Sequence, residues 1–379
     1  MKIEFRALLL ACLCTASIAA PAQAASVARV GATFAQDLLP AKVAIGGRIA
    51  IVPGSPGWNW QWPGLYFETA FAGKEAFFEV GPGATILRID VDGRTAATLA
   101  KPTPGLYRVS GLADHRPHIL RIQATTENQA GPNRFDGILL PLDSQPLPPP
   151  LRERRIEFIG DSHTVGYGNL SVRRECSEAE VWAMTDNTRA YGPMLASRFG
   201  ADYRVNAISG RGVVRNYDGM DAPTLPQAYP FALFDGRTPV ADDGWQPQVV
   251  VVALGTNDFS TPLHASERWS DRASLRADYE ATYADFLRSL RARYPAAYLL
   301  VWSTDLHGGE IRTAASRVVD ALSEAGETRI GFVPVTGLAM DGCHAHPSLR
   351  DHAAIAAALG SYLDAQPQAW PGPTDLPAH

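Results

Sequence analysis

The stretch Val-Val-Val-Val-Ala-Leu-Gly-Thr-Asn-Asp at residues 249–258 indicates the fold class of the larger part of this chain. Residues 249–254 form an unbroken apolar run bounded by polar turns, which is typical of a β-strand buried on both faces of a sheet. Runs of similar character occur at residues 155–159, 298–303 and 330–335. We therefore predict several strands of one buried sheet.

Amphipathic helices separate these predicted strands. In residues 278–293 the apolar positions follow helical spacing, and Pro295 ends the run. Residues 312–325 and 349–365 also have a helical pattern. Alternation of strands and helices predicts a parallel sheet in an α/β domain, which we place at residues 153–366.

The N-terminal third has a different character. Residues 25–140 contain short strand-like runs, and glycine and proline residues separate them. Asp92-Gly93 follows one such run and is a possible hairpin turn. This pattern predicts a β-sandwich. The sequence PLDSQPLPPP begins at Pro141 and predicts a stiff linker over residues 141–152. The proline-rich residues 367–379 are expected to form an irregular tail.

The first 24 residues read as a signal peptide. Lys2 and Arg6 precede a mostly apolar segment, and Ala22-Gln23-Ala24 is typical of a cleavage site. About 14 apolar residues are too few for a membrane anchor. We therefore expect an exported protein, periplasmic or extracellular, with no membrane association after signal removal.

Export would leave two cysteines, Cys176 and Cys343, in an oxidising compartment. This predicts a disulfide between them, and the alternative is two separate buried thiols.

Charge excludes several functional classes. The formal net charge is −5, which makes nucleic acid and acidic membrane surfaces poor partners. The only lysines are Lys2, Lys42, Lys74 and Lys101. A P-loop lysine, a Schiff-base lysine or a Ser-Lys pair therefore cannot occur in the C-terminal two-thirds.

Four segments place polar residues where a site is expected in a parallel sheet, beyond the carboxyl ends of strands. They are Gly-Asp-Ser-His-Thr at 160–164, Asn-Ala-Ile-Ser-Gly-Arg-Gly at 206–212, Gly-Thr-Asn-Asp at 255–258, and Asp-Gly-Cys-His-Ala-His-Pro at 341–347. Each one alone could be a turn, a cap or a structural histidine. Their order and strand context together indicate a catalytic site.

The residue types in these segments favour ester hydrolysis. Ser162 is the candidate nucleophile, and it needs a base to take its proton. His346 is the candidate base, because the pKa of imidazole lies near working pH. The backbone N–H groups of Ser162 and Gly210 and the side-chain amide of Asn257 are the candidate donors to the negative oxygen of the intermediate.

These segments resemble the signature blocks of SGNH (GDSL-type) hydrolases, whose name-giving residues match Ser162, Gly210, Asn257 and His346. The stretches at 160–169, 208–217 and 343–348 resemble carbohydrate esterase family 2. Trp62-Pro63-Gly64, with Phe71 and Gly73, resembles the jelly-roll domain of that family. The resemblance implies a three-layer α/β/α domain of SGNH type, preceded by a jelly-roll sandwich.

The resemblance also implies a function. Members of this family are acetyl esterases that deacetylate plant polysaccharides such as xylan and glucomannan, often at the primary O-6 position of hexoses. The implied partner is an acetylated oligo- or polysaccharide, and no metal or organic cofactor is implied. Two alternatives stay open: an SGNH esterase acting on another exported substrate, such as an acetylated cell-wall glycan or a lipid ester, and a carbohydrate-binding protein without hydrolytic activity.

The group that orients His346 is less clearly indicated. Many SGNH enzymes have an aspartate two or three residues before the base, but here those positions are His344 and Cys343. Asp341 is the candidate orienting acid, and the alternative is a Ser–His dyad oriented by a backbone carbonyl. Cys343, His344 and His346 are too few ligands to predict a metal site.

Aromatic residues are the candidate sugar-binding groups. We assign this role to Trp182, Tyr217, Trp245 and Trp269, which are expected in loops of the α/β domain. Trp58, Trp60 and Trp62 alternate along the chain and are expected in the sandwich core or at the seam between the domains. Residues 217–245 form a long irregular segment, which we expect to shape the substrate cleft beside the predicted catalytic residues.

Overall fold

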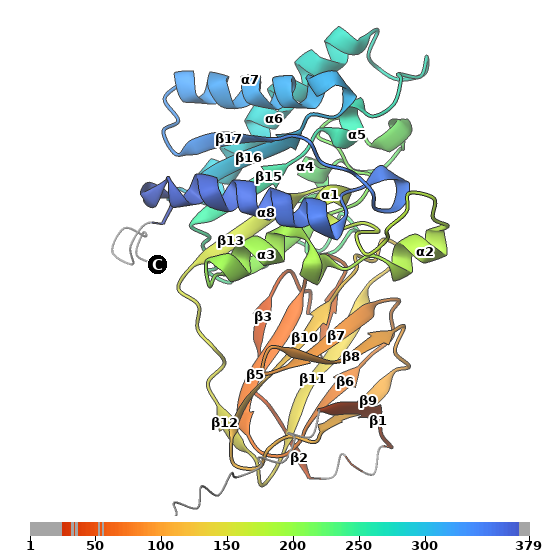
Figure 1. Ribbon diagram of the computed structural model, residues 1–379, viewed down its shortest axis with the longest axis vertical. Helices are drawn as coiled ribbons and strands as arrows, with labels where there is room; N and C mark the ends of the chain where they lie inside the picture. The colour runs from red at the N-terminus through yellow and green to blue at the C-terminus, as the bar shows by residue number, and fades with distance from the viewer. Residues whose placement is uncertain (1–24, 32–33, 35–36, 52–53, 55–56, 371–379) are drawn as a thin grey trace, which may run out of the picture.

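The computed structural model describes residues 25–31, 34, 37–51, 54 and 57–370. Figure 1 shows an antiparallel β-sandwich in the lower half and an α/β domain above it, which is the predicted fold class. The predicted signal peptide and residues 371–379 of the predicted tail lie outside the described residues. Among the helices of the described part, none is long and apolar enough to cross a membrane.

The sandwich consists of two antiparallel sheets. One has the strand order β1-β9-β6-β11-β2, with β4 also paired to β11, and the other has the order β12-β5-β10-β7-β8, with β3 also paired to β5. The strands are β1 (Ser26–Arg29), β2 (Leu38–Pro40), β3 (Ala44–Gly46), β4 (Trp58–Trp60), β5 (Tyr66–Ala72), β6 (Ala76–Val80), β7 (Ile86–Val91), β8 (Arg94–Ala100), β9 (Gly105–Ser110), β10 (Pro117–Ala124), β11 (Asn133–Pro141) and β12 (Gln145–Leu147). Apolar side chains of both sheets, among them Phe71, Phe78 and Ile122, form one buried core.

Two local signals of the sandwich can be compared with the structure. Asp92 and Gly93 both have positive φ and join β7 to β8, with Val91 opposite Arg94, so the predicted hairpin is confirmed. The proline-rich segment differs from a free linker, because β12 lies within it and pairs with β5. Pro146 is tolerated in β12 because β12 is an edge strand, where a missing N–H donor leaves no ladder bond unmade.

The α/β domain has a five-stranded parallel sheet with the order β14-β13-β15-β16-β17. These strands are β13 (Arg155–Gly160), β14 (Asp202–Ala207), β15 (Val249–Ala253), β16 (Tyr298–Thr304) and β17 (Ile330–Val335). The helices are α1 (Ser162–Val165), α2 (Glu178–Ala183), α3 (Tyr191–Arg198), α4 (Leu225–Ala228), α5 (Thr256–Phe259), α6 (Arg272–Arg293), α7 (Glu310–Glu324) and α8 (Leu349–Asp364). All four strands and all three helices predicted for this domain are present.

The valine run of β15 is buried on both faces, as predicted. Val250 and Val252 belong to the core cluster that includes α6 and α7, whereas Val249 and Val251 belong to the cluster that includes α3 and α8. Figure 1 shows these two pairs of helices covering opposite faces of the sheet. Because the five strands are parallel, their carboxyl ends lie at one edge of the sheet, where the polar segments follow.

The two domains share a buried seam. Trp58 and Trp60 pack in the sandwich core, whereas Trp62 is buried in a core cluster of the α/β domain, as predicted for this tryptophan series. The guanidinium of Arg48, from the sandwich, lies 3.6 Å from the buried carboxylate of Glu157 on β13. A buried charge pair of this kind is destabilising to break, so it holds the sandwich in one position against the catalytic sheet.

Candidate active site

Ser162 lies at the junction of β13 and α1. It is the first residue of α1 and is 5% exposed. The side chain of the N-cap residue Asp161 accepts a hydrogen bond from the N–H of His163 at 3.0 Å, which starts the helix immediately after the strand. Burial raises the pKa of Asp161 to about 7. The strand-to-helix turn therefore presents the Ser162 hydroxyl at the carboxyl edge of the sheet.

His346 lies beside Ser162, although the two residues are 184 positions apart in the chain. The distance from His346 Nε2 to Ser162 Oγ is 2.9 Å. The other ring nitrogen, Nδ1, lies 3.0 Å from the carbonyl oxygen of Cys343 and 3.2 Å from that of His344. Because carbonyl oxygens only accept, Nδ1 carries the hydrogen and Nε2 is free to accept the Ser162 proton. Burial lowers the pKa of His346 to about 4, so the ring is neutral at pH 7.

The structure corrects the assignment of Asp341 as the orienting acid. Asp341 is exposed, and its carboxylate lies 3.6 Å from the guanidinium of Arg174. The turn from Gly342 to His346 is closed by the backbone and not by Asp341, because the N–H of Gly342 donates to the carbonyl of His346 at 3.0 Å. His344 and Ala345 both have positive φ, and this uncommon backbone conformation turns the carbonyls of residues 343 and 344 towards the imidazole. The backbone-oriented dyad is the arrangement observed.

Replacing Asp341 with asparagine should therefore lower kcat/KM for 4-nitrophenyl acetate by less than about threefold, since no carboxylate–imidazole contact is lost. Initial rates at pH 7 would measure this. In a true triad the equivalent change costs about 10⁴ in kcat. A loss of about tenfold or more would show that Asp341 reaches His346 during turnover.

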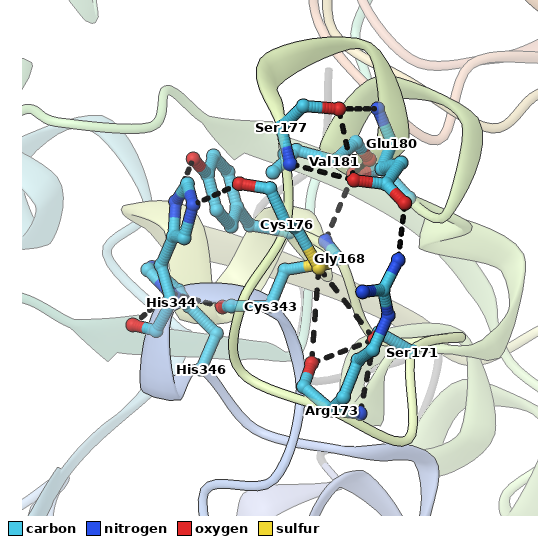
Figure 2. Close-up of a disulfide and its surroundings, with 12 residues drawn as sticks. Gly168, Ser171, Arg173, Cys176, Ser177, Glu180, Val181, Cys343, His344 and His346 are labelled. Atoms are coloured by element: carbon cyan, nitrogen blue, oxygen red, sulfur yellow. Dashed lines mark hydrogen bonds and ion pairs between the residues drawn. A yellow bond between two sulfur atoms is a disulfide. The ribbon is translucent and has the colours of Figure 1, made fainter.

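The predicted disulfide is present between Cys176 and Cys343, and it joins two loops beside the candidate base (Figure 2). His344 strengthens the same junction. Its Nε2 lies 2.7 Å from the carbonyl of Cys176, and its Nδ1 lies 3.0 Å from the hydroxyl of Tyr167. Cys343 and His344 are thus engaged in protein contacts, and within the described residues no group of His, Cys, Asp and Glu could hold a metal ion.

The candidate oxyanion donors lie on three neighbouring elements. Gly210 has φ +81°, a conformation that favours glycine, and lies in residues 208–216, which we call the Gly210 loop. In the described part of the chain the N–H groups of Ser162 and Gly210 have no protein hydrogen-bond partner. The side-chain amide of Asn257, on α5, donates to the carbonyl of Arg211 at 2.8 Å and to Asp161 at 3.2 Å. These contacts tie Asn257 to the chain neighbours of the other two donors, Asp161 before Ser162 and Arg211 after Gly210.

Asp258 is a residue that sequence reasoning missed. Its buried carboxylate accepts hydrogen bonds from the N–H groups of Val213, Val214 and Arg215, at distances between 2.8 and 3.1 Å. Burial raises its pKa to about 6. In the sequence, only its position directly after Asn257 pointed to a role in the site. In the structure, Asp258 holds one end of the Gly210 loop.

Two of the four aromatic residues assigned to sugar binding lie near the site. Trp182, on α2, lines a cavity of about 400 Å³ between the domains, together with Tyr167 of the α/β domain and Glu127, Asn128 and Gln129 of the sandwich. We call this the interdomain cavity. Tyr217 is exposed, and its N–H donates to the carbonyl of Gly210 at 2.9 Å.

The assignment of Trp245 is corrected, whereas Trp269 lies in the connection between β15 and α6 and its role in sugar binding stays a prediction. The ring of Trp245 stacks on the guanidinium of Arg204, 4.3 Å from the ring centroid, in the amino-terminal half of β14 and away from Ser162. Trp269 packs against the α/β core, and its indole N–H donates to Asp278 on α6 at 2.9 Å. Aromatic residues in loops carry no periodicity that would have revealed these positions.

The aromatic residue closest to the base was not predicted. The ring of Tyr167 lies 4.3 Å from that of His346, centroid to centroid, with the planes 33° apart. The ring of His163 meets the His346 ring edge-on at 5.5 Å. The Gly210 loop and residues 223–236, within the long irregular segment, line a further cavity of about 250 Å³.

Comparison with known families divides the chain in the same place as the structure. Residues 45–150 match the family described as carbohydrate esterase 2 N-terminal, and residues 158–359 match the GDSL-like lipase/acylhydrolase family. An acetylxylan esterase / glucomannan deacetylase of Cellvibrio japonicus is 38% identical over 342 residues, which cover 89% of this chain and 94% of that protein. A cellulase/esterase of Acetivibrio thermocellus is 29% identical over 79% of this chain, but over only 36% of its own length.

Solved structures show the same relationship. A carbohydrate esterase whose active site has divergent catalytic and non-catalytic binding functions is 37% identical, with a TM-score of 0.83 over 88% of this chain and 100% of the other. A family two carbohydrate esterase from Clostridium thermocellum, solved in complex with cellohexaose, is 26% identical, with a TM-score of 0.75 over 87% of this chain and 100% of the other.

Proposed function

The chain belongs to carbohydrate esterase family 2 of the SGNH (GDSL-type) hydrolases, and from that membership we propose that it removes O-acetyl groups from plant polysaccharides such as xylan and glucomannan through a Ser162–His346 dyad. That it is a carbohydrate acetyl esterase of the serine hydrolase class follows from its relatives. The single observation that carries the dyad is the 2.9 Å distance between His346 Nε2 and Ser162 Oγ.

The reaction begins with proton transfer from the Ser162 hydroxyl to His346 Nε2. Ser162 Oγ attacks the acetyl carbonyl, and the carbonyl π electrons move onto oxygen to give a tetrahedral oxyanion. The intermediate then expels the sugar oxygen, which receives the proton from His346. Water attacks the acetyl-Ser162 ester in the same manner and releases acetate, with His346 acting as base and then as acid.

The resting charge of His346 suits it to this role. Its pKa of about 4 keeps the imidazole neutral above about pH 5, so the base is available. Among the described residues, no carboxylate is hydrogen-bonded to the ring of His346. The carbonyls of Cys343 and His344 accept the Nδ1 hydrogen of the imidazolium, and the negative ends of their dipoles take the place of the charge that a triad acid would supply.

The oxyanion is expected to bind the N–H groups of Ser162 and Gly210 and the side-chain amide of Asn257. In the resting structure both amide hydrogens of Asn257 are directed at protein acceptors. The contact to Asp161 is the longer one, 3.2 Å against 2.8 Å for Arg211. The substrate oxygen would therefore replace Asp161, whereas the bond to Arg211 would keep Asn257 in place.

The interdomain cavity is the proposed place for the sugar. It adjoins Tyr167, whose ring packs on His346, and the side chain of Trp182 lines it. An aromatic face suits the apolar C–H face of a pyranose. A primary O-6 acetyl extends furthest from the sugar ring, so it can reach the buried Ser162 most easily. The disulfide and the predicted signal peptide support action outside the cytoplasm.

Acetate release from a panel of regiodefined acetylated mannosides, glucosides and xylosides tests the proposal. We expect 6-O-acetyl hexosides to be deacetylated about tenfold faster, in kcat/KM, than 2-O- or 3-O-acetyl isomers, because a misplaced acetyl loses orientation in the transition state. Lipid esters of matched leaving-group reactivity serve as the control. Release from these esters alone, with none from the sugars, would overturn the carbohydrate assignment.

A further inference from the structure

The Gly210 loop is held from outside its own domain. In the sandwich, the segment between β10 and β11 carries Glu127 and Gln129. The N–H of Ser209 donates to both carboxylate oxygens of Glu127, at 3.0 and 3.2 Å. The amide Nε2 of Gln129 donates to the carbonyl of Ser209 at 3.1 Å. Both backbone groups of Ser209 are thus bound by the other domain.

The bond to the Ser209 carbonyl acts on the donor peptide itself. The carbonyl of Ser209 and the N–H of Gly210 belong to one peptide unit, which is planar and trans. A hydrogen bond that fixes the direction of the carbonyl therefore also fixes the direction of the N–H. It further polarises the unit, which makes the N–H a stronger donor. Gln129 thereby reaches the Gly210 donor without touching it.

The sandwich segment that carries Glu127 and Gln129 is itself held by hydrogen bonds within the sandwich. The side chain of Gln61 donates to the carbonyl of Asn128 at 2.9 Å, and the N–H of Asn128 donates to the carbonyl of Gln61 at 3.0 Å. Gln129 Nε2 also donates to Glu127 Oε1 at 3.2 Å. A segment that is pinned in this way can impose its geometry on Ser209 rather than follow it.

The far side of the loop is held by its own domain. Asp258 binds the N–H groups of residues 213–215, and the carbonyl of Arg211 accepts the amide of Asn257. The loop is thus bound on both sides of Gly210, by Glu127 at Ser209 and by Asp258 at residues 213–215. A shift at Ser209 would be passed through Gly210 to Arg211, and so to Asn257, which is a second proposed oxyanion donor.

We propose that Glu127 and Gln129 are positioning residues for the esterase reaction, and that through them the β-sandwich completes the oxyanion site of the α/β domain. The inference rests on the proposed function, because it assumes that the Gly210 N–H binds the oxyanion. The N-terminal domain would then contribute to transition-state stabilisation, in addition to any contact that this domain makes with sugar.

The test uses the full-length mature protein and 4-nitrophenyl acetate, a substrate too small to depend on the interdomain cavity. The variants are Glu127→Ala, Glu127→Gln and Gln129→Ala. We expect kcat to fall about 10- to 100-fold for Glu127→Ala and about 5- to 20-fold for Gln129→Ala, with KM changed by less than about threefold, because only transition-state contacts are weakened. Glu127→Gln keeps an acceptor for the Ser209 N–H and should restore kcat to within about fivefold of the parent protein.

Tyr66→Phe is the matched control. The Tyr66 hydroxyl also bonds a carboxylate across the domain seam, that of Asp202, but Asp202 begins β14 whereas Ser209 follows its other end. Tyr66→Phe should leave kcat within about twofold while lowering the melting temperature. Equal loss of kcat in this control and in Glu127→Ala would show a general effect of domain contact and overturn the inference.

A second readout isolates the oxyanion site. Diethyl 4-nitrophenyl phosphate phosphorylates the nucleophilic serine through an intermediate that presents a negative oxygen to the same donors. Its inactivation rate should fall in parallel with kcat in Glu127→Ala and Gln129→Ala. A rise in KM for acetylated sugar with unchanged kcat and an unchanged inactivation rate would instead show that these residues only bind sugar.

The outcomes also separate this inference from the proposed function. If the parent protein hydrolyses esters, a Ser162→Ala variant does not, and all three sandwich variants keep full kcat, the inference alone is wrong. If Ser162→Ala keeps the activity, the proposed function is wrong. Gln129 is exposed and Glu127→Gln is nearly isosteric, so at least these two variants keep the test open should Glu127→Ala fail to fold.

Discussion

Replacing Ser162 with alanine is expected to lower kcat for 4-nitrophenyl acetate by about 10⁴-fold or more, which is the scale on which serine hydrolases lose activity when the nucleophile is removed. The physical reason is that no other hydroxyl lies within reach of His346 Nε2, as far as the described residues show. Residual turnover would come from water activated by His346 beside an intact oxyanion site.

The measurement is steady-state release of 4-nitrophenol, together with mass spectrometry of the protein after mixing with substrate. The parent protein should gain a covalent acetyl group during turnover, and the variant should not. Ser303→Ala is a matched control, because Ser303 lies near the carboxyl end of another parallel strand and is equally buried, at 5% exposure. Full activity in Ser162→Ala would remove Ser162 from the mechanism.

Replacing Asn257 with alanine is expected to lower kcat by about 10²–10³-fold with little change in KM, since a donor that meets the oxyanion acts in the transition state and not on the bound ester. Part of this loss would come from the Arg211 carbonyl, which loses its partner at 2.8 Å and so loosens the Gly210 loop. Both effects weaken oxyanion binding, so both appear in kcat.

Separate determination of kcat and KM for an acetylated sugar and for 4-nitrophenyl acetate would check this. Asn206→Ala is the comparison variant, because Asn206 is a fully buried asparagine of β14 whose amide donates to Glu157 within the core. It should lower thermal stability and leave kcat near that of the parent protein. If Asn257→Ala raised KM and kept kcat, Asn257 would be a ground-state sugar contact instead of an oxyanion donor.

Much of this site could be predicted because topology constrains it. Residues that directly follow parallel strands must gather at one edge of the sheet, so Ser162 after β13 and Asn257 after β15 become neighbours wherever the intervening chain runs. Gly210 follows β14, the other neighbour of β13. The disulfide was predictable for a different reason, because two cysteines in an oxidising compartment have only each other as partner.

Orientation was harder to predict than position. Asp341 was assigned to His346 because it is near in the chain, but the direction of the imidazole depends on the φ angles of His344 and Ala345. Trp245 was assigned by residue type alone, and residue type does not distinguish the two edges of a sheet. Glu127 was missed because its segment meets Ser209 only when two domains pack together.

By itself, the sequence predicted the two-domain architecture and the gathering of Ser162, Gly210 and Asn257, because hydrophobic periodicity and strand order constrain which residues share an edge. His346 was predicted from its segment and the family resemblance, and the pairing of Cys176 with Cys343 from the cysteine count. Only the tertiary structure decided that backbone carbonyls orient the base, and that the sandwich holds the peptide before Gly210. Hydrogen bonds act over about 3 Å, so they depend on side-chain directions and domain packing that no pattern along the chain encodes.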